Sequence, residues 1–385
     1  MGKKNKLFKN YSNNIFIEKT ISNDLEQSKL EEIVVTSVSK NKKLVSLLSN
    51  RKFTYTVSIL LFVFVCILVG KNFYYKSKFV TIRQRQDEEV RINEYEIEDV
   101  SELKNPAADE YVNCIKQKVN KKDLSSEVNS VIKKINDYYG QSRNYFAFKY
   151  VDIYTGFSVS YNENQKIFAA SSIKAPTDLY IWEMASLGKI NLDDKLKYTL
   201  RYYNTGSGKL KNGKFNVNYT IRDLLKYSTV DSDNAAHNML EDKFGRKNML
   251  KFWKEKGTKA IFTQNNNWGP TSAHDAAIYM MELYRFYTEN KEYGEAAMNN
   301  FLKAHPKFIS NPAGYKIANK AGWAGSSAHD VGIVFADNPY IIVALSNLGG
   351  QPYKPYFKKA SELAYELHTA YWKYKVELCG DIKQY

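Results

Sequence analysis

Strand-like segments lie at both ends of the region that begins near residue 124, and a long helical stretch separates them. Residues 145–153 and 157–161 are joined around a Thr-Gly turn and predict a β-hairpin. Residues 331–336 and 340–345 are rich in Val and Ile and are joined by Asp-Asn-Pro, which predicts a second strand pair. The simplest arrangement is one antiparallel sheet built from both ends of the region, in an α+β fold with helices that cover the sheet.

Helical periodicity accounts for most of the remaining sequence of this region. Residues 124–139 carry apolar side chains at helical spacing and are followed by Gly140, which predicts a helix and its end. A second helix is expected at 171–187, further helices dominate to about residue 304, and a last helix is expected at 356–374. The two groups of strands are therefore separated by a middle region that we expect to be all-α.

An apolar run without charged residues at 54–70 indicates a membrane anchor. With its aromatic flanks, at 54–75, it is just long enough to span a bilayer as one transmembrane helix. A cleaved signal peptide fits poorly, because about fifty residues precede the run and no small-x-small site follows it. Lys and Arg are more frequent just before the run than after it, which favours a cytoplasmic N-terminus and an extracytoplasmic C-terminal part. We therefore expect a single-pass protein of the cell membrane.

The parts on either side of the anchor differ in composition. Residues 1–53 hold 11 Lys and Arg against 5 Asp and Glu, which predicts a basic cytoplasmic tail. Residues 76–123 are rich in charge and poor in large aliphatic side chains, so we expect a stalk with transient helix. Residues 124–378 have the apolar periodicity of a folded domain, and residues 379–385 form a short C-terminal tail.

The three cysteines leave the redox state of the outer domain open. Cys66 lies inside the apolar run, whereas Cys114 and Cys379 flank the predicted domain. Outside the cell these two can form a disulfide, but two free thiols fit the sequence equally well. The chain has no Cys-x-x-Cys and its five histidines are scattered, so we predict no metal site and no cofactor.

The formal net charge of +15 favours anionic surroundings, such as a cell-wall polymer or a membrane surface. Nucleic acid is not expected as a partner, because the sequence lacks a cluster of Lys and Arg with interleaved aromatic residues and lacks a nucleic-acid-binding motif. The sequence leaves the oligomeric state open.

The first candidate for chemistry is the motif Ser171-Ser-Ile-Lys174, which follows a strand pair and begins a predicted helix. The lysine comes one turn after the serine, so the two side chains share a face of that helix. A buried lysine can lose its proton and act as a base. The ordinary structural explanation is a helix N-cap with a solvated lysine, since the Ser-x-x-Lys spacing occurs six more times in the chain.

Two further motifs come later in the chain. Ser232-Asp-Asn234 lies between two apolar helical segments and equally fits an ordinary capped turn. The motif at 320–323, Lys-Ala-Gly-Trp, stands just ahead of the strand-like run that begins at 331, where a glycine can serve a close backbone approach. Each motif taken alone fits a structural role without chemistry.

In this order and spacing, the three motifs resemble the S-x-x-K, S-D-N and K-T-G set of the class A β-lactamases and the low-molecular-weight penicillin-binding proteins. Flanking residues are also similar: Leu224 and Leu225 precede the second motif, and Gly-Ile-Val at 332–334 follows the third. The resemblance covers 124–378, two thirds of the 385 residues. It implies a five-stranded antiparallel sheet flanked by helices, with an all-α middle region.

The resemblance also implies a role for each residue that matches a catalytic position. Ser171 would be the nucleophile that becomes acylated, and Lys174 would accept its proton directly or through water. Ser232 would relay a proton to the leaving nitrogen. Lys320 would supply positive potential near Ser232 and the substrate carboxylate.

Three more positions are expected to bind the substrate. Asn234 would hold the substrate amide as well as Lys174, and Gly322 is expected at the substrate as the glycine of the third motif. The backbone N–H groups of Ser171 and Trp323 would form the oxyanion hole that stabilises a tetrahedral intermediate.

Two departures from the family pattern bear on the substrate. Class A β-lactamases carry a glutamate on a loop after the second motif, where it activates the water that breaks the acyl-enzyme. The matching stretch at 257–271 is shorter and has no Asp or Glu, and Glu255 and Asp275 lie outside it on predicted helices. Ala321 replaces the usual threonine of the third motif, which removes a hydroxyl that binds the substrate carboxylate. His329 can compensate, although an ordinary surface histidine is the simpler expectation.

Three functions stay open. Without a positioned carboxylate, hydrolysis of a β-lactam adduct should be slow, which favours a DD-peptidase-like serine hydrolase acting on D-Ala-D-Ala ends of peptidoglycan peptides. A true β-lactamase that hydrolyses β-lactam antibiotics is the second function. A sensor or binding protein that keeps the penicillin-binding pocket but turns over poorly is the third.

Overall fold

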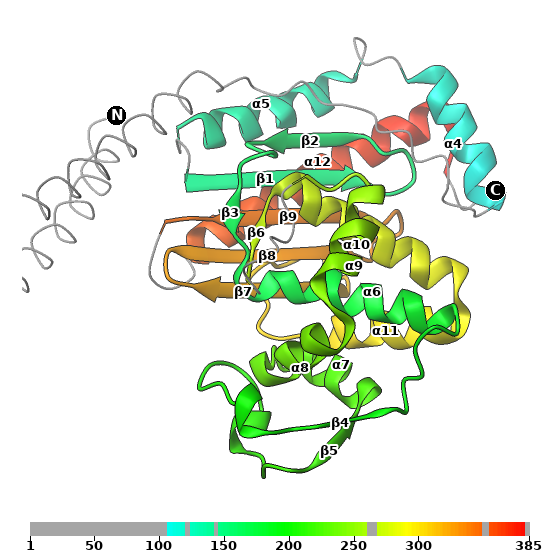
Figure 1. The fold of residues 1–385 in the computed structure, drawn as a ribbon. Coiled ribbons are helices and arrows are strands. Elements are labelled where there is room, and N and C mark those ends of the chain that lie inside the picture. Colours follow the sequence, from blue (N-terminus) through cyan, green and yellow to red (C-terminus); the bar gives the residue numbers. More distant parts are fainter. Residues whose placement is uncertain (1–105, 120–123, 142–144, 260–267, 349–353, 382–385) are drawn as a thin grey trace, which may run out of the picture. The chain divides into compact units, whose positions relative to one another are not determined.

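Five antiparallel strands form the central sheet of the part of the chain that the structure describes (Figure 1). The structure is a computed structural model and describes residues 106–119, 124–141, 145–259, 268–348 and 354–381. The strand order is β2-β1-β9-β8-β7, so two strands from the start of the domain pair with three from its end. This confirms the predicted five-stranded sheet. The strands are β1 (Phe146–Asp152), β2 (Ser158–Tyr161), β7 (Ile317–Ala324), β8 (Ser327–Val334) and β9 (Tyr340–Ser346).

Strand β9 shows why both faces of the sheet are covered by helices. Its odd-numbered residues, such as Ile341, pack into one hydrophobic core, and its even-numbered residues, such as Ile342, pack into another. Because side chains alternate across a strand, an unbroken apolar strand needs a helical layer on each side. Helices α5 (Ser126–Gly140) and α12 (Lys354–Cys379) cover one face, and α10 (Ala273–Glu289) covers the other.

Helix α6 (Lys174–Ser186) lies at the centre of the helical region. Ten of its 13 residues are buried, which is typical of a helix surrounded by other elements rather than one on the surface. The helices around it begin at defined residues, because side chains at most of their N-termini accept hydrogen bonds from the first-turn N–H groups. These helices are α7 (Ile221–Val230), α8 (Asn234–Phe244), α9 (Arg246–Glu255) and α11 (Lys291–Lys303).

The middle region is not purely α-helical, and this part of the prediction is wrong. It is interrupted by two small antiparallel pairs, β3 (Ile167–Phe168) with β6 (Pro270–Thr271) and β4 (Lys195–Lys197) with β5 (Asn218–Thr220). Strands of two or three residues are too short to show an alternating pattern in the sequence. The β3–β6 pair matters for the site, because β3 leads into the serine of the first motif.

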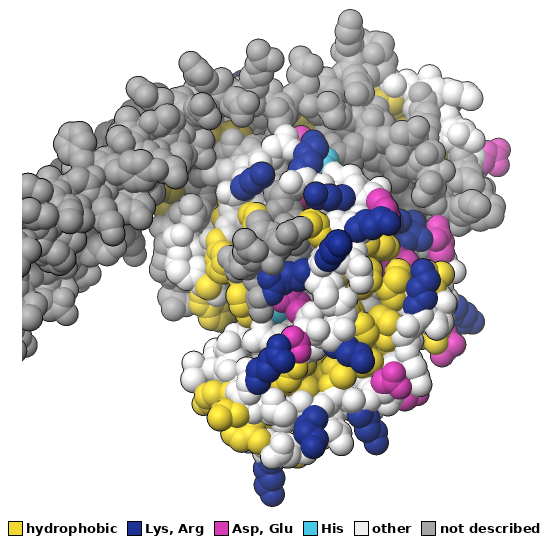
Figure 2. Space-filling view, viewed as in Figure 1, with side chains coloured by type: hydrophobic (Ala, Val, Ile, Leu, Met, Phe, Trp, Pro, Cys, Tyr) yellow, Lys and Arg dark blue, Asp and Glu magenta, His cyan; other side chains and the backbone are white. Residues whose placement is uncertain are grey.

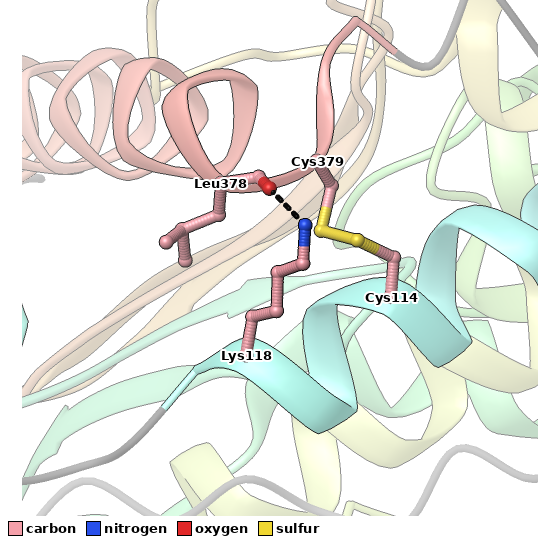
Figure 3. The surroundings of a disulfide bond; sticks show 4 residues. All are labelled: Cys114, Lys118, Leu378 and Cys379. Atoms are coloured by element: carbon pink, nitrogen blue, oxygen red, sulfur yellow. Dashed lines mark hydrogen bonds between the residues drawn. A yellow bond between two sulfur atoms is a disulfide. The ribbon is translucent and has the colours of Figure 1, made fainter.

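The segment predicted as a stalk ends in a helix that packs on the domain. Helix α4 (Pro106–Lys118) contacts α12, and Cys114 forms a disulfide with Cys379, the last residue of α12 (Figure 3). Beside it, the Lys118 ammonium donates a hydrogen bond to the Leu378 carbonyl at 2.7 Å. Of the two states that the sequence left open, the structure shows the disulfide.

The predicted transmembrane helix at 54–75 lies outside the described residues, as do the basic tail at 1–53 and most of the stalk. Among the helices that the structure describes, none combines the length and the apolar character that crossing a bilayer requires. The anchor and its orientation therefore stay predictions.

Candidate active site

The serine of the first motif lies on a tight turn between β3 and the buried helix α6. The sequence predicted that Ser171 opens this helix, but the structure places it in a short 3-10 turn, and α6 begins at Lys174. The turn is held at its start, where the Ala169 N–H donates to the Gly269 carbonyl at 3.0 Å and the Ser172 hydroxyl donates to the Ala169 carbonyl at 2.7 Å. Ser171 itself is partly exposed, so a substrate can reach it.

The Lys174 ammonium is buried among four oxygen atoms. It lies 3.0 Å from the Ser171 hydroxyl, and it also contacts the Ser232 hydroxyl at 3.2 Å and the Ser232 carbonyl at 2.7 Å. The fourth oxygen is the side-chain carbonyl of Asn234 at 2.7 Å. Burial lowers the pKa of Lys174 well below its usual value, and repulsion from Lys320 lowers it further. A neutral amine at this place can accept the proton of the Ser171 hydroxyl.

The Ser232 hydroxyl lies between two lysines. Lys320 donates a hydrogen bond to it at 3.0 Å, and Lys174 contacts it at 3.2 Å. Burial lowers the pKa of Lys320 to about 8, so its ammonium is mostly charged at neutral pH. A hydroxyl placed between a charged and a neutral amine can pass a proton to a leaving group and recover one.

The third motif lies within the edge strand β7, directly ahead of β8. Its position ahead of the strand at 331 was predicted, but that the motif itself forms a strand was not. Its lysine, alanine and glycine give little strand signal in the sequence, and pairing with β8 decides the structure. Because side chains alternate along β7, Lys320 and Gly322 both face the turn Ala170–Ile173. This turn carries the candidate nucleophile Ser171 and is the nucleophile turn. Trp323 points to the other face, where the centre of its ring lies 5.7 Å from the centre of the Phe308 ring. The backbone of Trp323, rather than its ring, therefore lies at the site.

Gly322 brings β7 into direct contact with the nucleophile turn. A Cβ atom at this position would lie 2.5 Å from the backbone nitrogens of Ser171 and Ser172. That distance is shorter than real side chains tolerate, so only glycine fits without moving one of the two backbones. The approach sets the Ser171 N–H beside the backbone of β7, as an oxyanion hole formed with Trp323 requires.

The second motif is fixed by the segment between β4 and β5. The Asp233 carboxylate caps α8 and also accepts the Leu210 N–H at 2.7 Å. The side-chain amide nitrogen of Asn234 donates to the Asn204 side-chain oxygen at 3.1 Å. This bond orients the amide so that its oxygen faces Lys174. Asn204 belongs to the site's surroundings and was not identified from the sequence.

His329 is buried, and the expectation of an ordinary surface histidine is wrong. Its Nδ1 accepts the Ser346 N–H at 3.3 Å, so Nε2 carries the proton and donates to the Phe168 carbonyl at 2.7 Å. Burial lowers the pKa of His329 to about 4, which keeps the ring neutral. The ring therefore cannot replace the hydroxyl that Ala321 lacks. It fastens β3, and through β3 it positions the nucleophile turn.

Two residues outside the motifs act on the active-site lysines. The ring centre of Trp268 lies 5.0 Å from the Lys174 ammonium. Asp178 is buried on α6, and its carboxyl attracts both Lys174 and Lys320. The signal for Asp178 was present in the sequence, because residues four apart share a face of a helix.

The stretch that carries the deacylating glutamate in class A β-lactamases is described only in part, since residues 260–267 lie outside the described residues. Its sequence contains no Asp or Glu. Asp275, just after it, is buried and accepts the Lys259 N–H at 2.8 Å, so this carboxylate fastens the end of the stretch. Glu255 is exposed at the end of α9.

Charge on the described surface is mixed. Figure 2 shows Lys and Arg side chains spread over one face with acidic side chains between them, rather than gathered in one patch. Within the described ranges, no group of three or more His, Cys, Asp or Glu is placed to hold a metal ion. The groups gathered at Ser171 are two hydroxyls, two amines and an amide.

Such a set around one accessible serine is typical of enzymes that transfer an acyl group to serine. A family model described as "Beta-lactamase enzyme family" matches residues 127–367, which is more than half of the chain. The chain therefore belongs to this family of β-lactamase-like and penicillin-binding-protein-like serine hydrolases. No curated protein sequence matches it.

Solved structures with the same fold include both kinds of family member. One is a point mutant of PBP-A in an acyl-enzyme complex with penicillin G, at 19% identity and a TM-score of 0.57, with 64% of this chain and 97% of that chain covered. A β-lactamase from Sphaerobacter thermophilus DSM 20745 has 16% identity and a TM-score of 0.52, over 65% and 97% of the chains. An ancestral class A β-lactamase, GNCA, has 14% identity and a TM-score of 0.54, over 62% and 99%.

Proposed function

We propose that the chain is a membrane-anchored serine hydrolase that forms an acyl-enzyme through Ser171. Its substrate would be the D-Ala-D-Ala end of a peptidoglycan peptide, as in DD-peptidases, and β-lactams would acylate the same serine. The observation that carries the proposal is the convergence of the hydroxyls of Ser171 and Ser232 with the amines of Lys174 and Lys320.

Each proton in the reaction has a place to go. The Ser171 oxygen attacks the carbonyl of the scissile amide, and Lys174 takes the hydroxyl proton. The Ser232 hydroxyl gives its proton to the amide nitrogen, which leaves as the amine of D-Ala, and Lys174 returns a proton to Ser232. An ester on Ser171 remains. Water then hydrolyses this ester and restores the serine hydroxyl.

The absence of a carboxylate from the sequence at 257–271 favours a peptidase over an efficient β-lactamase. In the peptide reaction the amine leaves the site, and water can take its place. In a β-lactam the leaving amine stays tethered to the acyl group and hinders the approach of water. Since the nearby Asp275 carboxylate is engaged with the Lys259 N–H, it does not offer a free base for that water. A long-lived β-lactam adduct is the expected result.

The disulfide supports an extracytoplasmic domain. Disulfides persist outside the cytoplasm and are rare within it, so the Cys114–Cys379 bond fits a domain on the outer side of the membrane. That is the side on which peptidoglycan peptides are found. The anchor proposed at 54–75 would hold the site close to them.

The test is covalent labelling of the full chain, purified in detergent, with a fluorescent penicillin. The wild type should carry one stable label, and Ser171→Ala should carry none. Ser186→Ala is the matched control, because Ser186 and Lys189 form another Ser-x-x-Lys on the same helix region, and it should label like the wild type. Release of D-Ala from a peptide ending in D-Ala-D-Ala should depend on Ser171. A wild type that takes no label and releases no D-Ala would refute the proposal.

A true β-lactamase is the second candidate, and the presence of β-lactamases among the structures with this fold favours it. Rapid hydrolysis of nitrocefin by the wild type, lost in Ser171→Ala, would support this function instead. A stable label without D-Ala release would indicate a penicillin-binding sensor.

A further inference from the structure

Asp178 lies in the interior of the domain, and no cation of the described residues forms a direct ion pair with it. It is fully buried on α6, four residues after Lys174. Its two carboxyl oxygens accept hydrogen bonds from two hydroxyls, Ser228 at 2.9 Å and Thr229 at 2.7 Å. A buried carboxyl that lacks a cation in direct contact is unfavourable for stability, so its presence calls for a reason.

The two hydroxyls lie at the end of α7, just before the second motif. Helix α7 ends at Val230, and Ser232 follows two residues later. The carboxyl of Asp178 therefore joins the helix that carries Lys174 to the segment that presents Ser232. In this way it fixes the distance between the base and the proton-relaying hydroxyl.

When it is ionised, the same carboxyl is a buried negative charge that acts on both active-site lysines. It attracts Lys174 on its own helix and Lys320 on β7. Two other carboxylates take part: Asp233, before α8, acts on Lys174, and Asp330, on β8, acts on Lys320.

Two other polar contacts of α6 involve residues other than Asp178. On α10, Arg285 pairs with Glu183 at the far end of α6, and Trp253 of α9 donates to the Pro176 carbonyl. Of the three carboxyls that act on the active-site lysines, Asp178 is the one that acts on both.

We propose that Asp178 is a positioning residue of the acylation site: its carboxyl ties helix α6, which carries Lys174, to the turn that presents Ser232, and its charge acts on both active-site lysines. The inference rests on the proposed function, because it concerns the rate at which Ser171 is acylated. Asp178 does not touch the reacting atoms and acts through Ser232 and the lysines.

The direction of the pH effect follows from burial. Burial raises the pKa of Asp178 to about 7, and burial lowers the pKa of Lys320 to about 8. Above pH 7 the ionised carboxyl attracts the Lys320 ammonium and delays the loss of its proton. Without this charge, Lys320 loses its proton at lower pH. The fall of the acylation rate at high pH, which is the alkaline limb of the pH profile, then moves to lower pH.

The decisive variant is Asp178→Asn, which keeps the shape and removes the charge. Both partners are hydroxyls and can accept a hydrogen bond from the new amide. We expect the alkaline limb of penicillin acylation to move down by about 0.5 to 1 pH unit. Thr229→Val removes one hydrogen bond that favours the ionised carboxyl, so it should move the limb in the same direction by less.

Thermal stability gives a readout that does not depend on activity. A carboxyl whose pKa is raised by folding favours the folded state at low pH and loses this contribution as pH rises toward 7. Asn has no proton to lose. The melting temperature of Asp178→Asn minus that of the wild type should therefore be larger at pH 8 than at pH 5.5.

Thr177→Val is the matched control, since Thr177 is a buried, uncharged neighbour on α6 that bonds the Ile173 carbonyl. It should leave the alkaline limb unchanged. Two results together would overturn the inference and leave Asp178 with only a structural role. They are an alkaline limb of Asp178→Asn that coincides with that of the acylated wild type, and a melting temperature of the variant that is lowered equally at pH 5.5 and pH 8. If the wild type takes no label at all, the proposed function fails instead.

Discussion

Gly322→Ala tests the contact on which the oxyanion hole depends. The new Cβ would lie 2.5 Å from the nitrogens of Ser171 and Ser172, so one backbone would have to withdraw by about 0.9 Å to reach an ordinary 3.4 Å contact. A misplacement of about 1 Å at a reacting group costs about 10²-fold in rate, and loss of one oxyanion donor costs about 10² to 10³-fold. We expect penicillin acylation to slow by about 10² to 10³-fold, with a stability loss of about 1–3 kcal/mol.

The matched control is Gly332→Ala on the neighbouring strand β8. Its Cβ would lie 2.7 Å from the Ala318 carbonyl, so it also strains the sheet, but it does not approach the nucleophile turn. Both variants should melt below the wild type, and only Gly322→Ala should lose acylation when label incorporation is followed by stopped flow on the folded protein. Equal acylation rates for Gly322→Ala and the wild type would show that the close approach is not part of the site.

Two further tests concern the charge of Lys320 and the disulfide. The rate of acylation should fall as pH rises through about 8, because burial lowers the pKa of Lys320 to about 8 and only its charged form attracts the substrate carboxylate. Labelling rates measured from about pH 6 to 10 check this. A rate that still rises beyond about pH 9 would contradict it. Replacing Cys114 and Cys379 by Ser should lower the free energy of unfolding by about 2–4 kcal/mol, since the bond joins residues 265 apart. Denaturant titration measures this loss of stability. The labelling rate at about 25 °C should stay the same.

The sheet could be predicted because its signals are local and strong. The Thr-Gly turn at 155–156 and the Asp-Asn-Pro connection at 337–339 each join two apolar runs, and β9 is apolar on both faces, as a strand between two helical layers must be. The three motifs could be found because their residue types are fixed by the chemistry. Their convergence depends on long-range packing, which only the structure shows.

Other parts of the site left little or no signal in the sequence. His329 reads as one polar residue in a β-rich stretch, and its burial depends on the Phe168 carbonyl, which is distant in sequence. Lys320 lies in a strand whose neighbours Ala321 and Gly322 have low strand preference, so pairing with β8 overrides the local pattern. In each case a contact between distant segments, rather than a local preference, decides the conformation.

Backbone conformation at the site points to the same kind of long-range control. Among the described residues, four non-glycine residues have positive φ, and two are asparagines, which adopt such angles at little cost. The others are Ala170 at 47°, beside the proposed nucleophile Ser171, and Ser232 at 54°, the proposed proton relay. A left-handed conformation costs about 1–2 kcal/mol for such residues, so the surroundings must hold it in place. At Ser232 this hold comes from Lys174, whose amine binds the carbonyl at 2.7 Å and also contacts the hydroxyl. The proposed base thus fixes the conformation of the proposed relay, and we expect a substitution of Lys174 to change the turn as well as the proton transfer.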